Sequence, residues 1–187
     1  MLSFAGKDLS AVSTDKRGET REEAVALGAQ LTGRGIVPLL GYSKEVTNTL
    51  EDIQHTETET IRCIEAAGSL KKPVFVAIKL SGLSFEAEMR RLEQEVHSLV
   101  SSSPVMPDLL GRSREILSRY PDLVGRLQRI SIAAEKFDVN LVVDAEIRFQ
   151  EGRVDSLPTS AILCWSLNSN KGHVWNTHQM YSALPSF

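Results

Sequence analysis

Two apolar segments of this sequence each end on a charged residue. Residues 73–78 lead into Lys79, and residues 140–143 lead into Asp144. Continuous apolar, β-branched runs of this kind are typical of parallel strands that are covered on both faces. A charge at the end of such a strand is costly to desolvate unless it has a partner or a task. Because ligands bind at the carboxyl ends of parallel strands, Lys79 and Asp144 are a candidate active-site pair.

Several chemistries are open to these side chains. The Lys79 ammonium could hold a substrate carboxylate, or its amine could form a Schiff base. Asp144 and Glu146 are two residues apart on one strand, so they share a face and could bind a divalent metal or pair with Lys79. A solvated lysine and an ordinary polar strand edge are the alternatives without a function. If Lys79 and Asp144 end neighbouring strands, both side chains should open at the same end of the sheet.

The composition narrows the functional classes. A chain of 187 residues that is 42% hydrophobic and 24% charged is predicted to form a single globular domain. Its net charge of −3 gives no indication of a nucleic-acid partner. Cys63 and Cys164 have no metal-like spacing, which indicates free thiols in a reducing compartment. No apolar run is long enough to span a membrane, and no transit peptide is recognisable.

Helical and strand patterns alternate along the chain. The capping box at Thr20–Glu23 opens a helix that ends at Gly33 to Gly35, and further helices are predicted over residues 48–67, 84–100, 108–118 and 122–137. Strands are predicted over residues 36–42, 73–78 and 140–144, with a last short strand over residues 173–175. Pro38 has no N–H to donate, which puts the first strand near a sheet edge. The alternation predicts an α/β fold with a parallel sheet and right-handed crossovers.

Four segments follow one another in a recognisable order. They are Leu39–Glu45 (LLGYSKE), Val76–Leu83 (VAIKLSGL), Leu141–Glu146 (LVVDAE) with Phe149 and Gln150, and Asn176–Tyr181 (NTHQMY). Each motif alone is weak. Their order and rough spacing over residues 36–181 resemble the consecutive strand motifs of the proline dehydrogenase family.

The resemblance implies a partial (β/α)8 TIM barrel with about the first four strand–helix units and parallel strands. It implies FAD bound without a covalent bond, and oxidation of L-proline to 1-pyrroline-5-carboxylate with the electrons passing to a membrane quinone. It also implies a mitochondrial location, in the matrix or at the inner membrane, and peripheral membrane association. Carried over by position, Lys79 would be the cation near substrate and flavin, Asp144 the acid beside it, and Gln179 a hydrogen-bond partner of the flavin ring.

The sequence departs from the family pattern near the site and between the last two motifs. Gly41 stands where the family has an aspartate, and His178 where it has a tyrosine. Residues 151–171 are a divergent segment with weak periodicity and several breakers. The family has a helix there, and residues 158–167 fit one poorly.

A further departure concerns the end of the sequence. Residues 1–187 read as one domain that is truncated at its C-terminus, with an aberrant tail over residues 182–187. In the family, later strands carry the basic groups for the flavin phosphates and an arginine pair for the proline carboxylate. We therefore expect weak or no flavin binding and no proline turnover by this chain.

Two other functions remain open. A barrel lyase or aldolase would use Lys79 as its Schiff-base amine, and an inactive half barrel would act only by pairing with another chain. Four strands cannot close a barrel, so the sheet should keep two edges, one of them near residues 173–175. We expect self-association through such an edge and exposed apolar area at Ile78, Leu141 and Val142.

Overall fold

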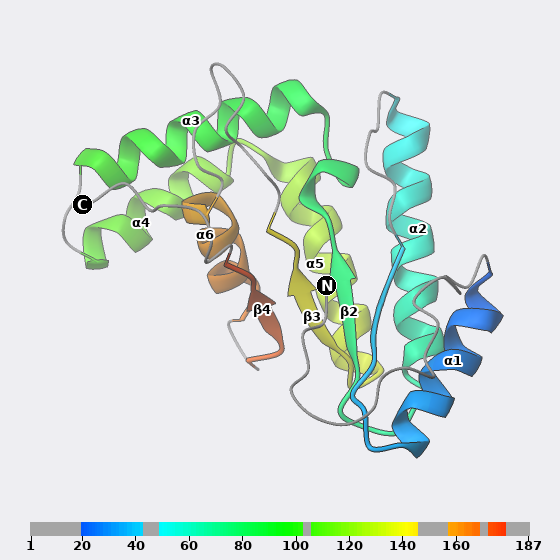
Figure 1. Ribbon diagram of the computed structural model, residues 1–187. Coiled ribbons are helices and arrows are strands. Elements are labelled where there is room, and N and C mark those ends of the chain that lie inside the picture. Colours follow the sequence, from blue (N-terminus) through cyan, green and yellow to red (C-terminus); the bar gives the residue numbers. More distant parts are fainter. Residues whose placement is uncertain (1–19, 43–48, 103–105, 146–156, 169–171, 179–187) are drawn as a thin grey trace.

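The computed structural model describes residues 20–42, 49–102, 106–145, 157–168 and 172–178. Within these residues the fold is α/β, with one four-stranded sheet in which every strand is parallel to its neighbour (Figure 1). The strands are β1 (Leu39–Gly41), β2 (Phe75–Ile78), β3 (Asn140–Val143) and β4 (Val174–Asn176). They lie side by side in chain order, which confirms the predicted parallel sheet.

Six α-helices accompany the sheet in the described part of the chain. They are α1 (Arg21–Gly33), α2 (Leu50–Ala67), α3 (Glu86–Ser102), α4 (Met106–Leu117), α5 (Pro121–Lys136) and α6 (Leu157–Leu167), and a 3-10 turn, η1 (Leu80–Gly82), follows β2. Local side chains explain two helix starts. The Thr20 hydroxyl accepts from the Glu23 N–H at 3.2 Å in the predicted capping box, and the Thr49 hydroxyl accepts from the Asp52 N–H at 3.1 Å.

The helices pack against one face of the sheet. Burial alternates along β2 and β3, so that Val76, Ile78, Leu141 and Val143 are at most 2% exposed, whereas their neighbours in the strands are half-buried. The buried residues join the side chains of the helices in one hydrophobic core. The expected exposure of Ile78 and Leu141 is therefore wrong, because both side chains face the helical layer, while Val142 is half-buried on the other face.

The two edges of the sheet are β1 and β4, as predicted for the strand near residues 173–175. Strand β1 begins at Leu39, three residues later than predicted, and Pro38 precedes it. Pro38 contributes only its carbonyl, which accepts from the Phe75 N–H at 3.2 Å. An edge strand tolerates this because its outer side needs no ladder donor.

The poor fit of residues 158–167 to a helix is a prediction that the structure overturns. Helix α6 covers Leu157–Leu167, and Ile162, Leu163 and Cys164 in its middle are all buried. The helix is apolar on most of its circumference, so its sequence carries no amphipathic period to detect. Pro158 lies in the first turn, where a missing N–H costs no helical hydrogen bond. The flanking residues 151–156 and the tail over residues 182–187 lie outside the described residues.

No helix in the described ranges has both the length and the apolarity that crossing a membrane requires.

Candidate functional site

The carboxyl edge of the sheet brings Lys79 and Asp144 onto neighbouring strands. Ile78 is the register partner of Val143, and the Asp144 N–H donates to the Ile78 carbonyl at 2.9 Å. Lys79 and Asp144 are the next residues along each strand. The expectation that both open at the same end of the sheet is therefore confirmed.

Lys79 and Asp144 also share one face of the sheet. Side chains alternate along a strand, and Ile78 and Val143 point into the helical core. The next residue on each strand therefore points to the opposite face, where Lys79 and Asp144 are both half-buried. This placement keeps a cation and an acid out of the apolar core.

The turn after Lys79 is held from the helical layer. Lys79 itself is extended, with φ −105° and ψ 123°, and its carbonyl accepts from the Gly82 N–H at 3.2 Å to open η1. At the end of this turn, the Leu83 carbonyl accepts a hydrogen bond at 3.0 Å from the guanidinium of Arg126 on α5. Arg126 is only 6% exposed. It therefore positions the backbone that presents Lys79.

The sequence patterns do not single out Arg126, although a signal is present. Leu123, Leu127, Ile130 and Ala134 form the buried stripe of α5, and Arg126 occupies a position on that same stripe. A charge in an apolar stripe needs a partner inside the protein. This indicates a structural contact, but it does not tell which carbonyl receives it.

Thr177 follows β4 and lies beside Asp144, on the side away from Lys79. Its N–H and its hydroxyl both donate to the Val143 carbonyl, at 3.2 and 2.9 Å. The pair of bonds continues the ladder one residue beyond β4 and puts the half-buried Thr177 next to Asp144. His178, the next residue, is exposed. Gln179 and Glu146 lie outside the described residues, so their predicted roles stay predictions.

The same face has an apolar and aromatic character below the charged edge. The Phe75 and Trp175 rings meet edge to face with centroids 6.4 Å apart, and Trp175 is 53% exposed. Gly41 is the register partner of Ala77, and a Cβ on Gly41 would lie 3.4 Å from the Ala77 Cβ. Gly41, Ala77 and Trp175 lie at the same level across the sheet. Small side chains occupy this level at β1 and β2, and an aromatic side chain occupies it at β4.

The metal hypothesis depends on residues that are only partly described. In the ranges with assigned structure, no group of three or more His, Cys, Asp or Glu side chains is arranged to hold a metal ion. Asp144 belongs to these ranges and Glu146 does not. The pairing of these two acids on a metal therefore stays a prediction.

No family model matches the chain, and no curated protein matches it. The functional inference therefore depends on the geometry of the strand edge and on the four motif segments.

Proposed function

We propose that the carboxyl edge of this sheet is the flavin-ring and substrate end of an FAD-dependent proline dehydrogenase. One observation carries the proposal: each of the four motif segments begins on one of four consecutive strands. The segments that begin at Leu39, Val76, Leu141 and Asn176 start within β1, β2, β3 and β4, in that order. The order of the motifs along the chain is therefore also the order of the strands in the sheet.

The strand order supports a (β/α)8 barrel as the parent architecture. In a doubly wound sheet the order reverses at a switch point and helices cover both faces. Here the order is β1-β2-β3-β4, and the described helices pack against one face. In a barrel, consecutive strands are neighbours, helices form the outer layer, and the site lies at the carboxyl ends.

The site suits a flavin ring better than flavin phosphates. Lys79 and Asp144 offer polar contacts to a flavin ring at the carboxyl edge, while the Phe75 and Trp175 rings lie on the same face toward the amino ends of the strands, where the Trp175 Nε1–H donates to the Asn140 Oδ1 at 3.4 Å. Residues of β1 to β4 include no cation, and Lys79 directly follows β2. Bound FAD would supply the two-electron acceptor. Weak flavin affinity is therefore expected of this chain, because the described edge gives the pyrophosphate little positive charge.

A neighbouring cation and anion also suit a zwitterionic substrate. Lys79 would attract the carboxylate of L-proline, and Asp144 would attract its ring ammonium. Oxidation removes a hydride from the ring carbon beside the nitrogen and a proton from the nitrogen, which leaves a C=N bond. The two residues would orient the substrate for that loss, and the electrons would pass on to a quinone.

The two tryptophans of the chain allow a direct test. Trp175 lies on the proposed flavin face, whereas Trp165 lies on α6 under the Arg114 guanidinium at 5.3 Å. In the Trp165→Phe variant, we expect riboflavin and FAD to quench Trp175 fluorescence with similar weak affinities, since both carry the same ring. Adding Asp144→Asn or Lys79→Ala should weaken the quenching.

The control for this titration is the Trp175→Phe variant. Trp165 remains in that variant, and its fluorescence should stay unchanged because it is in the helical layer. Equal quenching of both tryptophans would show that flavin binds elsewhere and would contradict the proposal.

The rival Schiff-base chemistry predicts a different product. Borohydride should then trap a carbonyl substrate on Lys79. Lys72 is the internal control, because burial lowers the pKa of its amine and a nonspecific adduct would also form there. We expect no adduct confined to Lys79, and finding one would favour a lyase or aldolase over a flavoenzyme.

A further inference from the structure

The outer edge of β4 is already occupied by a side chain. In a parallel ladder, alternate residues of a strand direct their N–H and C=O groups to opposite sides. The His173 carbonyl accepts from the Leu141 N–H of β3 at 2.8 Å, so the backbone of Val174 faces away from β3. There the Asn168 side-chain amide accepts from the Val174 N–H at 2.9 Å and donates to the Val174 carbonyl at 2.7 Å. Asn168 therefore fills the place where a further strand would begin to pair.

The outer edge of β1 has no such cover in the described part of the chain. The Pro38 carbonyl accepts from the Phe75 N–H of β2, so the backbone groups of Leu39 and Gly41 face the other way. No hydrogen bond from a described residue reaches these outward groups. Leu39 is 44% exposed, and Gly41 is exposed as well. Residues 36–42 carry no charge that would oppose an added strand.

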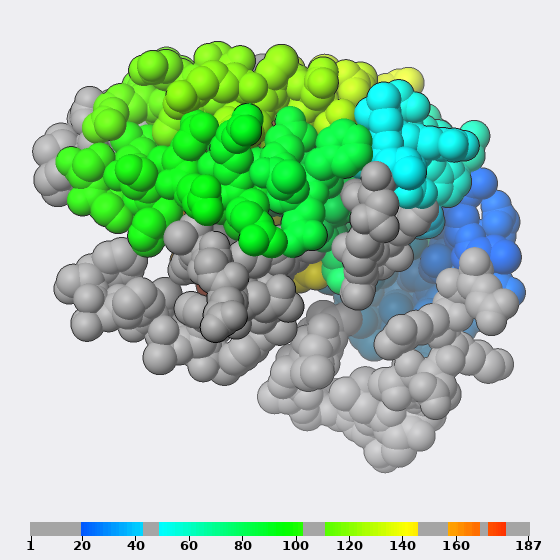
Figure 2. Space-filling model, turned by 90° about the horizontal axis from the view of Figure 1, so that it is seen from above, coloured from blue at the N-terminus to red at the C-terminus, as the bar shows by residue number. Residues whose placement is uncertain are grey.

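The β1 edge lies at the end of the molecule that carries α1 and α2. Figure 1 shows β1 on their side of the sheet, and Figure 2 shows the blue α1 next to the cyan α2 at one end of the molecule. Helix α1 is itself thinly covered, since Gly28 is its only buried residue and Leu27 and Leu31 are half-buried. An added strand would therefore find apolar surface on the helix beside β1 as well as on β1 itself.

We propose that β1 pairs with β1 of a second copy of this chain, in antiparallel orientation, to form one continuous sheet. The strand is self-complementary, because pairing about Leu40 sets Leu39 opposite Gly41 of the second copy, and Gly41 opposite Leu39 of that copy. Residues that face each other in this way exchange both N–H···O=C bonds. Leu39 and Gly41 lie on the open face of the sheet, since Leu40 between them is buried on the helical face.

This self-complementarity is what singles out a second copy as the occupant of the β1 edge. Each Leu39 side chain packs over a glycine, which has no side chain to obstruct it. The self-association expected of an open sheet is thereby assigned to β1 and not to β4. The proposal is independent of the flavin chemistry, because neither Lys79 nor Asp144 takes part in the pairing.

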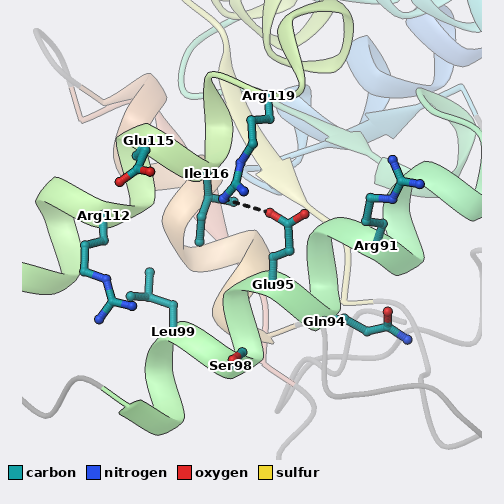
Figure 3. Close-up of a pocket in the computed structure, with 9 residues that line it drawn as sticks. All are labelled: Arg91, Gln94, Glu95, Ser98, Leu99, Arg112, Glu115, Ile116 and Arg119. Atoms are coloured by element: carbon teal, nitrogen blue, oxygen red, sulfur yellow. Dashed lines mark ion pairs between the residues drawn. The ribbon is translucent and has the colours of Figure 1, made fainter.

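The first test is the oligomeric state of the whole chain, measured by sedimentation velocity over a range of concentrations. We expect a monomer–dimer equilibrium. Leu39→Lys should raise the dissociation constant by about tenfold or more, because it places like charges close together across the two-fold axis. Gln94→Lys is the matched control, since it adds the same charge at an exposed position of α3, where Figure 3 shows the side chain directed away from α4. A monomer at every concentration, or an equal effect of the two variants, would overturn the proposal.

Cysteine variants test the register of the pairing. Antiparallel residues that exchange hydrogen bonds have Cα atoms about 5.5 Å apart, within the range that a disulfide spans. Oxidation of Leu39→Cys mixed with Gly41→Cys should therefore give a disulfide-linked dimer in higher yield than either variant alone. Cys63 and Cys164 remain in both variants, but burial raises their pKa to about 11 and about 12, so they supply few reactive thiolates. An equal yield from Leu39→Cys alone would contradict the antiparallel register.

Removing the Asn168 side chain tests the contrast between the two edges. Asn168→Ala frees the N–H and C=O groups of Val174, so the chains should then associate at both edges and form species larger than dimers. Asn168→Ala combined with Leu39→Lys should form only dimers, through β4. Circular dichroism checks that each variant keeps its helices. If Asn168→Ala forms no species larger than a dimer, Asn168 does not protect β4, and the contrast that assigns the pairing to β1 is lost.

Discussion

The two faces of the sheet both carry apolar residues, but they differ in how deeply these residues are buried. On the helical face, Val76, Ile78, Leu141 and Val143 are almost completely buried. On the other face, Phe75, Ala77 and Val142 are half-buried, Trp175 is exposed, and the strands end in Lys79 and Asp144. Among the described residues, the helices therefore cover one face of the sheet and leave the other half-buried. Substitutions on the two faces should separate stability from ligand binding.

The largest effect on stability is expected on the helical face. Leu141→Ala should lower the free energy of unfolding by about 2–5 kcal/mol, because the side chain is 0% exposed and its removal leaves a cavity. The measurement is urea denaturation followed by circular dichroism. A loss below about 1 kcal/mol would show that this face is not closely packed.

A smaller loss is expected where the helical layer reaches the strand edge. Arg126→Leu leaves the buried Leu83 carbonyl without its donor and should cost about 1–3 kcal/mol. Arg129→Leu is the control on the same helix. Arg129 makes a two-pronged ion pair with Glu57, whose side chain is 12% exposed, but Arg129 itself is 58% exposed, so we expect Arg129→Leu to cost less than Arg126→Leu. If both variants lost the same free energy of unfolding, Arg126 would have no special role in positioning the turn.

Stability should also fall in alkaline solution. Burial raises the pKa of Cys63 to about 11 and that of Cys164 to about 12, from an ordinary value of 9.0. Above about pH 9 the unfolded chain loses these protons while the folded chain keeps them. The unfolded state then binds fewer protons, so the free energy of unfolding decreases as the pH rises toward 11, and these thiols contribute no slope below pH 9.

The size of this alkaline loss is on the order of 1 kcal/mol for each thiol. Urea unfolding of the wild-type chain and of Cys164→Ala, compared across this pH range, measures it. The variant should show a shallower decline at high pH, whatever its stability near neutrality. An unchanged slope would mean that the Cys164 thiol is not shielded from water.

The smallest effect on stability is expected on the open face. Trp175→Ser should change the free energy of unfolding by less than about 1 kcal/mol, because the side chain is 53% exposed and sits on an edge strand. The same variant should abolish the flavin-dependent change in fluorescence. A loss as large as that of Leu141→Ala would show that both faces contribute equally to the core, and the contrast between them would fail.

Periodicity and position explain what the sequence predicts well. The amphipathic stripes of α2, α3 and α5 locate these helices to within a few residues, and the ends of the apolar runs place Lys79 and Asp144 at one edge. Helix α6 escapes prediction because it is apolar nearly all round. The face on which Ile78 and Leu141 lie could not be predicted either, because a continuous apolar run does not indicate which face the helices will cover. Arg126 and Thr177 act through backbone carbonyls, which no sequence pattern identifies.

The hydrogen bond from Arg126 links the dynamics of two layers. A single guanidinium joins the middle of α5 to the end of the turn that presents Lys79. Opening of that turn must either break this bond or draw on the packing of α5. A ligand that immobilises Lys79 should therefore slow amide hydrogen exchange not only in the turn but also in the helix on the other side of the sheet.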